Sequence, residues 1–277
     1  MLDILKAVLF GIVEGITEWL PVSSTGHMIL LNEFIKLGVS DEFYKLFEVV
    51  IQLGAILAVV MVYFKTIWPF TKKKEKIVLD KGVLNLWGKI LVACIPAAVL
   101  GLLFDDFLDE HLYNAVVVSI ALIVYGVLFI VIENGRKGKK EVKGQTINDI
   151  TYKQAAEVGA FQILALIPGT SRSGSTIIGG LLLGLNRSVI TEFTFLVAIP
   201  VMAGASFLKL LKYIVKVGFA FSGLEIAILV VSCIVAYVVS MFVIKFMINY
   251  IKNHDFKIFG YYRIVLGIIV LLYFILK

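Results

Sequence analysis

The composition of the 277-residue chain excludes a soluble domain. The chain is 60% hydrophobic with a mean hydropathy of +0.97, and only 17% of its residues are charged, which is typical of integral membrane proteins with several spans. The formal net charge of +6 is concentrated in loops, a distribution that favours anionic lipid headgroups over nucleic acid. We therefore expect the bilayer as a partner and no nucleic acid.

Six segments are long and apolar enough to cross a membrane, since a transmembrane helix needs roughly 20 mostly apolar residues. In chain order they are residues 43–64, 83–104, 115–133, 190–213, 223–248 and 258–276. Two further apolar stretches, residues 4–35 and 151–188, are interrupted in the middle by Pro, Gly, Ser and Thr. The first stretch carries acidic residues and no cleavage site, so we expect it to remain in the mature protein rather than act as a signal peptide.

The loops predict an orientation. Residues 65–81 and 136–153 are rich in lysine and should be cytoplasmic, whereas the acidic connection at residues 105–111 should face outward. Alternation of the spans then places the carboxyl terminus outside. Lys212 and Lys216 fall in a loop that this orientation places outside, which is an exception to the enrichment of lysine in cytoplasmic loops. The lysines that carry the argument are Lys72, Lys73, Lys74, Lys76, Lys137, Lys139, Lys140 and Lys143.

The two interrupted stretches resemble each other. WLPVSSTGH has Pro21 three residues before Ser24, and LIPGTSRSG has Pro168 three residues before Ser171. The similarity continues downstream, where Glu48 follows the first stretch and Glu192 follows the second at nearly the same offset.

Each half of the chain thus contains one broken segment and three spans. An odd number of spans inverts the second copy, as in transporter-like folds whose sites lie between discontinuous helices near the midplane. We expect an all-α polytopic membrane protein with six transmembrane helices, two re-entrant broken helical hairpins and an inverted-topology repeat. It forms a single integral membrane domain, residues 1–277, with repeat 1 at about 1–135 and repeat 2 at about 150–277. A kinked ordinary span is the simpler alternative for each interruption.

The first broken segment, EGITEWLPVSSTGH, predicts a cation site. Glu14 and Glu18 lie one helical turn apart on the same face, and two like charges in an apolar setting need a proton or a cation between them. A hard divalent cation, Mg²⁺ or Ca²⁺, is the natural occupant because its preferred ligands are oxygens. The alternative is a polar vestibule in which both carboxylates are solvated.

Downstream of these acids, the same segment offers hydroxyls and an imidazole. Ser23, Ser24 and Thr25 precede Gly26 and His27. A hydroxyl becomes a nucleophile when a base lies within hydrogen-bond reach, and histidine suits that role near neutral pH. Structural roles for these residues are the alternative, because serines in membrane helices often bond to a carbonyl one turn earlier.

The second broken segment supplies the opposite charge. GTSRSGST places Arg172 among hydroxyl groups, and guanidinium binds phosphate oxygens in a bidentate manner. A helix that restarts here would aim its N-terminal amides at the same anion. We expect phosphate contacts from Ser23, Thr25, Ser171, Arg172, Ser173 and Thr176. Arg263, in GYYR, is interpreted as a snorkelling residue near the inner end of the last span. Together the two segments predict metal-assisted phosphoryl transfer.

At these residues the chain resembles the bacterial undecaprenyl-pyrophosphate phosphatase family, also known as bacitracin-resistance proteins. Both EGITEWLPVSSTGH and PGTSRSGST match signature segments of that family, and the likeness runs essentially end to end. The acid-phosphatase-like lipid phosphatases also contain an SGH and an SR element. They place a histidine six residues beyond the arginine, where this chain has Ile178, so that family does not fit.

The resemblance implies hydrolysis of undecaprenyl pyrophosphate to the monophosphate lipid carrier of cell-wall synthesis, with a divalent cation, in the bacterial inner membrane, at a site facing outward. It also implies bacitracin resistance and assigns functional positions to Glu14, Glu18, Ser24, His27 and Arg172. The expected partner is a polyprenyl pyrophosphate lipid; a homodimer is a further partner that the sequence allows. A polyprenyl-phosphate flippase without hydrolysis is the alternative function. The sequence does not decide between Ser24 as nucleophile and water activated by His27.

Overall fold

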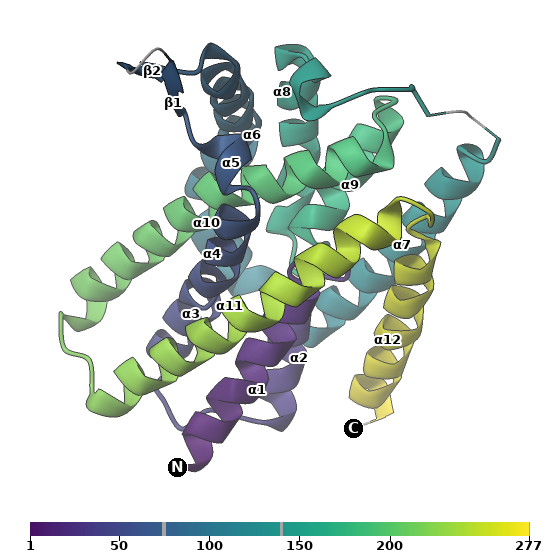
Figure 1. The fold of residues 1–277 in the computed structure, drawn as a ribbon. Coiled ribbons are helices and arrows are strands. Elements are labelled where there is room, and N and C mark those ends of the chain that lie inside the picture. Colours follow the sequence, from purple (N-terminus) through teal and green to yellow (C-terminus); the bar gives the residue numbers. More distant parts are fainter. Residues whose placement is uncertain (74–75, 139–140, 277) are drawn as a thin grey trace.

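The computed structural model describes residues 1–73, 76–138 and 141–276, and this part of the chain is almost entirely helical (Figure 1). The parts of the loop-charge prediction that rest on Lys74, Lys139 and Lys140, and on the side chains of Lys73, Asp105, Asp106 and Asp109, lie outside the described residues. The helices are α1 (Leu2–Thr17), α2 (Ser24–Phe34), α3 (Asp41–Val50), α4 (Gln52–Val62), α5 (Phe64–Ile67), α6 (Lys81–His111), α7 (Ala115–Gly135), α8 (Tyr152–Gln162), α9 (Arg172–Leu182), α10 (Arg187–Val217), α11 (Gly223–Ile251) and α12 (Lys257–Leu276). Two short 3₁₀ turns, η1 (Ile147–Asp149) and η2 (Ile163–Leu166), complete the helical elements.

The prediction of six spans is confirmed for the described residues, six of whose helical segments are long and apolar enough to cross a membrane. They are Asp41–Val62, Lys81–Phe104, Ala115–Gly135, Arg187–Val217, Gly223–Ile251 and Lys257–Leu276. The first of these consists of α3 and α4, which are separated at Ile51. The chain is thus a multi-pass, all-α membrane protein.

The two interrupted stretches each form a pair of helices separated by a break. In Figure 1, α1 and α2 occupy the lower part of the view and α8 and α9 the upper part. Residues 18–23 separate α1 from α2, and residues 163–171, including η2, separate α8 from α9. The breaks contact each other, since the Ser173 hydroxyl at the start of α9 donates to the Glu18 carbonyl oxygen at 3.3 Å.

A two-stranded antiparallel hairpin, which the sequence did not predict, joins the α4–α5 region to α6. It consists of β1 (Phe70–Lys73) and β2 (Lys76–Leu79). Its base is closed by a hydrogen bond from the Asp80 amide to the Pro69 carbonyl oxygen, 2.7 Å long.

Glycines bring α7 and α12 into close contact. A Cβ on Gly126 would lie 2.7 Å from the Gly260 carbonyl oxygen, and a Cβ on Gly260 would lie 2.7 Å from the Gly126 carbonyl oxygen. No side chain fits at either position, so the two backbones meet directly. This contact holds the next turn of α12, which carries Tyr262 and Arg263, beside the two breaks.

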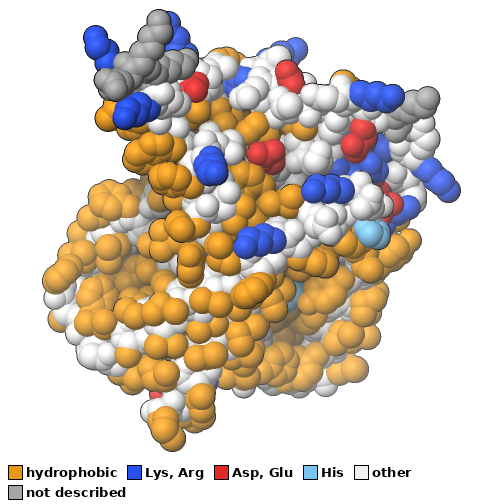
Figure 2. All heavy atoms as spheres, in the orientation of Figure 1, with side chains coloured by type: hydrophobic (Ala, Val, Ile, Leu, Met, Phe, Trp, Pro, Cys, Tyr) orange, Lys and Arg blue, Asp and Glu red, His pale blue; other side chains and the backbone are white. Residues whose placement is uncertain are grey.

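The surface has the character expected of a membrane protein. Figure 2 shows hydrophobic side chains over the middle and lower part of one face, whereas charged side chains gather at the upper end. The largest apolar core surrounds the breaks and includes Trp19, Phe129, Phe193 and Phe195. A rigid apolar framework therefore encloses the polar breaks.

Candidate active site

The two breaks end in the same local geometry. Ser23 has a φ of +74° and Ser171 a φ of +76°, and they are the only non-glycine residues with positive φ in the described part of the chain. Each hydroxyl caps the following helix by accepting a hydrogen bond from the amide of the glycine three residues on, Gly26 at 3.2 Å and Gly174 at 3.1 Å. Serine is a strong N-cap residue, so the motifs SSTG and SRSG set the geometry of both turns. The strained backbone is typical of functional sites.

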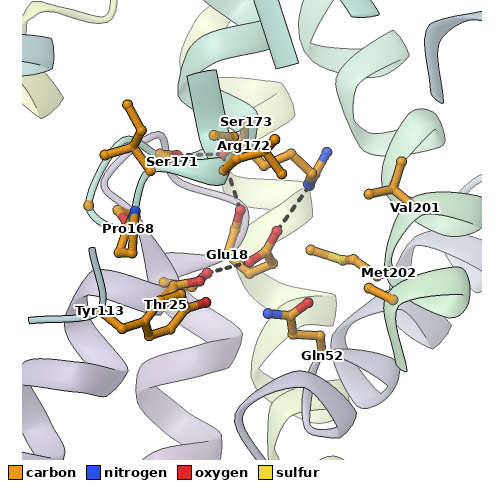
Figure 3. A pocket seen from close by; sticks show the side chains of 17 residues that line it. Glu18, Thr25, Gln52, Tyr113, Pro168, Ser171, Arg172, Ser173, Val201 and Met202 are labelled. Carbon is orange, nitrogen blue, oxygen red and sulfur yellow. Dashed lines mark hydrogen bonds and ion pairs between the residues drawn. The ribbon is translucent and has the colours of Figure 1, made fainter. Parts of the chain in front are cut away.

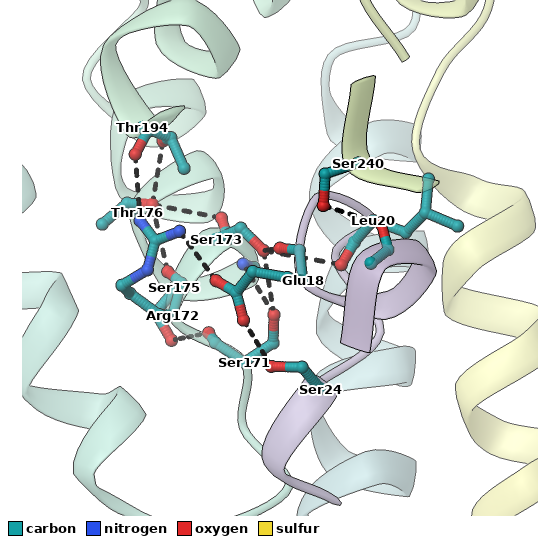
Figure 4. Close-up of polar contacts among 12 residues, drawn as sticks. Glu18, Leu20, Ser24, Ser171, Arg172, Ser173, Ser175, Thr176, Thr194 and Ser240 are labelled. Carbon is teal, nitrogen blue, oxygen red and sulfur yellow. Dashed lines mark hydrogen bonds and ion pairs between the residues drawn. The ribbon is translucent and has the colours of Figure 1, made fainter. Parts of the chain in front are cut away.

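Glu18, Ser24 and Arg172 meet between the breaks. Arg172 Nη2 donates to Glu18 Oε1 at 3.0 Å, and the Ser24 hydroxyl donates to the other carboxylate oxygen in a short hydrogen bond (Figure 4). All three side chains are buried or nearly so. Because a buried ion pair gains little net stability once its desolvation is counted, we interpret this arrangement as functional rather than stabilising.

Arg172 does not use all of the five N–H groups of its guanidinium. Its Nη1 donates to the Thr194 carbonyl oxygen at 2.9 Å, whereas its Nε has no hydrogen-bond partner among the described residues. The guanidinium is therefore fixed in orientation by α10 and by Glu18, and it can still donate to an incoming oxyanion.

The cluster opens into a cavity of about 140 Å³, which Figure 3 shows from close by. Seven predicted site residues line it, namely Glu18, Ser23, Ser24, Thr25, Ser171, Arg172 and Ser173. Its walls come from both breaks and from α4 and α10. The structure thus brings most of the predicted phosphate-contacting residues to one cavity.

Thr176 lies away from this cavity. Its hydroxyl is buried in a network with the Thr194 hydroxyl at 2.9 Å and the Arg172 carbonyl oxygen at 3.0 Å. In this position it fixes α9 to α10 beside Arg172. Ser173 lines the cavity, but its hydroxyl also bonds to the first break, so it too helps to join the halves.

Glu14 is the most unusual carboxylate. It is fully buried, and neither of its oxygens has a hydrogen-bond partner among the described residues. It lies one turn before Glu18, whose amide donates to the Glu14 carbonyl oxygen at 3.0 Å. Leaving a buried carboxylate unpaired costs several kcal/mol, on the order of the penalty for any isolated buried ion, so the group requires a proton or a cation.

The residues present fit a hard cation of low protein coordination. In the described part of the chain, no group of three or more His, Cys, Asp or Glu side chains is placed to hold a metal ion. Mg²⁺, however, is commonly held by one or two carboxylates together with substrate phosphates. Glu14, whose two oxygens have no partner among the described residues, and Glu18, whose oxygens accept from Arg172 and Ser24, would be the two carboxylates. Glu18 lines the cavity, whereas Glu14 lies one helical turn before it and outside the lining.

The structure gives His27 different partners from the predicted ones. Its Nδ1 is 2.7 Å from the Ser23 carbonyl oxygen, and its Nε2 is 2.8 Å from the Tyr262 hydroxyl. A carbonyl can only accept, so Nδ1 carries the proton and, in the neutral ring, Nε2 accepts from Tyr262. The rings are stacked, with centroids 5.7 Å apart. The hydroxyl of Ser24 is directed to Glu18 instead.

Arg263 was wrongly interpreted as a snorkelling residue. Its side chain is 0% exposed, and it donates to the carbonyl oxygens of Pro21 at 3.1 Å, Gly169 at 2.8 Å and Thr170 at 2.9 Å. Broken helices leave carbonyl groups without partners in an apolar interior, and one guanidinium satisfies such groups from both breaks. The signal in the sequence was an arginine within an apolar span, which is costly unless it has a partner.

Two cavity residues escaped the sequence analysis. Gln52 points into the cavity from α4, and Tyr113 lines it from the connection between α6 and α7 (Figure 3). The signal for Gln52 was a single amide in the apolar run VVIQLGAIL. Tyr113 gave no such signal, because tyrosines are common near membrane surfaces.

The chain is similar to known proteins over nearly its whole length. Residues 7–269 match the family described as bacitracin resistance protein BacA. The chain is 57% identical over 272 residues to an undecaprenyl-diphosphatase of Enterococcus faecalis, covering 98% of this chain and 97% of that protein. It is 55% identical over 275 residues to an undecaprenyl-diphosphatase of Acetivibrio thermocellus, covering 99% of each. Undecaprenyl-diphosphatase 1 of Clostridioides difficile is 56% identical over 276 residues, covering 100% of this chain and 98% of that protein.

Proposed function

The chain belongs to the bacitracin resistance protein BacA family, and we propose that it hydrolyses undecaprenyl pyrophosphate to undecaprenyl phosphate and inorganic phosphate. It is an undecaprenyl-diphosphatase of the membrane, which recycles the lipid carrier of cell-wall synthesis and confers bacitracin resistance. The observation that carries this function is the meeting of Ser24, Glu18 and Arg172 at one cavity between the two breaks. A flippase without hydrolysis is not favoured, because the relatives from Enterococcus faecalis and Acetivibrio thermocellus are named undecaprenyl-diphosphatases.

In the proposed reaction, Ser24 is the nucleophile and Glu18 its base. The hydrogen bond from the Ser24 hydroxyl to Glu18 is already formed, so the proton passes to the carboxylate as Ser24 Oγ bonds to the terminal phosphorus. The bond from that phosphorus to the bridging oxygen breaks, and the lipid monophosphate leaves with the electron pair. Glu18 passes its proton to the leaving phosphate, and water then attacks the phosphoserine while Glu18 accepts a proton from that water. The proton returns to Ser24 Oγ as its bond to phosphorus breaks, which releases inorganic phosphate and restores Ser24.

Arg172 stabilises the charge that develops on the transferred phosphoryl group. Its orientation is set by the Thr194 carbonyl and by Glu18, and because Arg172 lines the cavity, its remaining N–H groups would donate to the phosphoryl oxygens. A preorganised donor in an apolar site needs no reorganisation during the reaction. Apolar walls such as Val201 and Met202 exclude water and strengthen this interaction.

Glu14 and Glu18 would hold a divalent cation, Mg²⁺ or Ca²⁺, with the phosphates of the substrate completing its coordination. When bound, the cation would neutralise phosphate charge. The unpartnered oxygens of buried Glu14 support this proposal.

We further propose that the two broken pairs are re-entrant hairpins of an inverted repeat, with repeat 1 at about 1–135 and repeat 2 at about 150–277. The positions of α1–α2 and α8–α9 at opposite ends of Figure 1 support this architecture. The lysine-rich loops favour a site that opens outward from the inner membrane. The prenyl tail stays in the bilayer, because withdrawing it would lose roughly 0.8 kcal/mol per CH₂. A homodimer stays a prediction that cross-linking would test.

Phosphate release from polyprenyl pyrophosphate by the purified protein, with and without a chelator, tests the function. Ser24→Ala should lower kcat by about 10³-fold or more. Ser119→Ala is the matched control, because Ser119 is equally buried but bonds only to the Ala115 carbonyl oxygen of its own helix. Equal activity of the two variants would remove Ser24 from the mechanism.

The orientation is tested by labelling. Thr25 lines the cavity and is partly exposed, so Thr25→Cys in a Cys94→Ala/Cys233→Ala background should react with an impermeant thiol reagent added outside intact cells. Substrate should slow the reaction. Labelling from the cytoplasmic side alone would overturn the outward-facing assignment.

A further inference from the structure

The β1–β2 hairpin has one exposed face that is mostly apolar. Phe70 pairs with Leu79, and Lys72 pairs with Ile77. Cross-strand partners and residues two apart share a face, so these four side chains lie together. Phe70 is 47%, Leu79 53% and Ile77 76% exposed. The pair between them points the other way and is partly buried. The hairpin therefore packs its inner face on the protein and leaves the outer face uncovered.

This exposed face continues the lipid-facing surface of a span. Leu57, Met61, Phe64 and Trp68 are all exposed. Leu57 and Met61 are four residues apart on one face of α4, Phe64 begins α5, and Trp68 follows α5 directly. Aromatic contacts extend the row, since the Phe64 and Trp68 ring centroids are 5.0 Å apart and those of Trp68 and Phe70 are 5.5 Å apart. The exposed apolar residues of α4, a predicted span, are thus followed by exposed aromatic rings that lead to the hairpin.

The hairpin is fixed in place. Trp87 Nε1, on α6, donates to the Ile67 carbonyl oxygen at 2.9 Å, and the Asp80 amide closes the strands' base on Pro69. Its exposed face therefore has a defined direction relative to the spans on either side.

Positive charge surrounds this apolar face. Residues 65–81 contain six lysines and two acidic residues, and Lys65, Lys72, Lys76 and Lys81 are exposed in the described part. The Asp80 carboxylate is occupied, because it caps α6 by accepting from two backbone amides. Figure 2 shows basic side chains next to hydrophobic ones at this corner of the molecule.

We propose that the hairpin face is a binding site for an anionic phospholipid of the adjacent leaflet, whose acyl chains lie on the apolar residues while its headgroup lies between the lysines. The residues of this hairpin face are Trp68, Phe70, Lys72, Ile77 and Leu79. Lys76 is exposed on the other face of β2 and adds to the positive charge around the hairpin. A zwitterionic lipid would cover the apolar residues without neutralising the lysines. Each lysine near an anionic surface contributes about a fivefold change in partitioning. The proposal does not depend on the hydrolysis of any substrate.

Trp68 provides the probe, because bromine on an acyl chain quenches nearby tryptophan fluorescence. The full chain is placed in nanodiscs of phosphatidylcholine with a small, fixed mole fraction of brominated phosphatidylglycerol or brominated phosphatidylcholine. Subtracting the signal of Trp68→Phe isolates this residue from Trp19 and Trp87. Brominated phosphatidylglycerol should quench Trp68 at several-fold lower mole fraction than brominated phosphatidylcholine.

Lys72→Gln/Lys76→Gln should remove this preference, with a loss on the order of tenfold or more in relative lipid affinity. Lys137→Gln/Lys143→Gln is the matched control, because it removes the same charge from exposed positions of another loop. Equal quenching by the two lipids in the unmodified chain, or a preference that survives in the hairpin variant, would overturn the proposal. Absence of quenching by either lipid would overturn it too, because a protein surface would then cover the face. Phosphate release in the same discs reports separately on the proposed function.

Discussion

The two breaks have similar backbone geometry but carry opposite charges. Both end in a serine at positive φ that caps the next helix, with a glycine amide three residues on. The first break places Glu18 and Ser24 at the cavity, and the second places Arg172 there. Phosphoryl transfer needs both a proton acceptor and a cationic hydrogen-bond donor to phosphate, and neither break alone supplies both. The comparison teaches that similar turns acquire different chemistry through single residues, and that the site exists only where the turns meet.

Among the variants that test this comparison, the largest effect is expected from the charge of the second break. Arg172→Lys should lower kcat/KM by about 10²- to 10³-fold, because lysine cannot contact Glu18, the Thr194 carbonyl and a phosphate together. Phosphate release by the purified variant checks this, and size-exclusion profiles show whether it is folded. Arg136→Lys is the control, since Arg136 also donates to backbone carbonyls, those of Leu181 and Leu185, outside the cavity. Near-normal turnover of a well-folded Arg172→Lys protein would contradict the proposed role.

The next effect concerns the residue that holds both breaks together. Arg263→Lys should lower the free energy of unfolding by about 2–3 kcal/mol, because lysine replaces only part of the charged hydrogen bonding to three buried carbonyls. Thermal denaturation in detergent measures it. Arg263→Met, which donates to none of them, should be less stable still. If both variants are as stable as the unmodified protein, the two breaks do not need this link.

A smaller effect is expected when a carboxylate is neutralised, and it should differ between Glu14 in the first half of the chain and Glu192 in the second. Glu14→Gln should weaken activation by Mg²⁺ or Ca²⁺ by about tenfold or more, while binding of the lipid changes less. Activity titrated against each cation provides the measurement. Glu192→Gln, which changes the counterpart of Glu48 after the second break, should leave the cation dependence unchanged. A dependence unaltered by Glu14→Gln would assign that carboxylate another function.

The smallest effect is expected at His27. Tyr262→Phe keeps the ring stack but removes the donor to Nε2, so stability should fall by about 0.5–1.5 kcal/mol and turnover only a few-fold. Nitrogen NMR of labelled histidine should show the proton on Nδ1 in both proteins. The adjacent exposed Tyr261→Phe serves as control. A loss of turnover as large as that of Ser24→Ala would instead place His27 in the proton transfer.

Hydropathy and charge were enough to predict the membrane spans and the two breaks, because both follow from local composition. The spans follow from runs of apolar residues, and the breaks from polar residues that an apolar span excludes. The ion pair between Glu18 and Arg172 was not predicted, because the sequence analysis assigned Glu18 to a cation and Arg172 to the substrate phosphate. The hairpin of residues 70–79 was not predicted, because its consecutive lysines concealed the alternation of apolar and polar residues that is typical of a strand. Arg263 and Tyr262 were missed because their partners are 242 and 235 residues away in the chain, and periodicity contains no information about such contacts.

The position of Arg263 on the last helix has a consequence for biogenesis. Pro21 leaves the ribosome 242 residues before Arg263, a delay of roughly 10 to 50 s at ordinary rates of synthesis. Throughout that interval the nascent chain must keep the carbonyls of both breaks solvated or otherwise bound, because they cannot be left bare in lipid. The catalytic cavity is consequently assembled at the end of membrane insertion. A ribosome stalled before α12 would leave a chain with its spans inserted and its two serine turns unjoined.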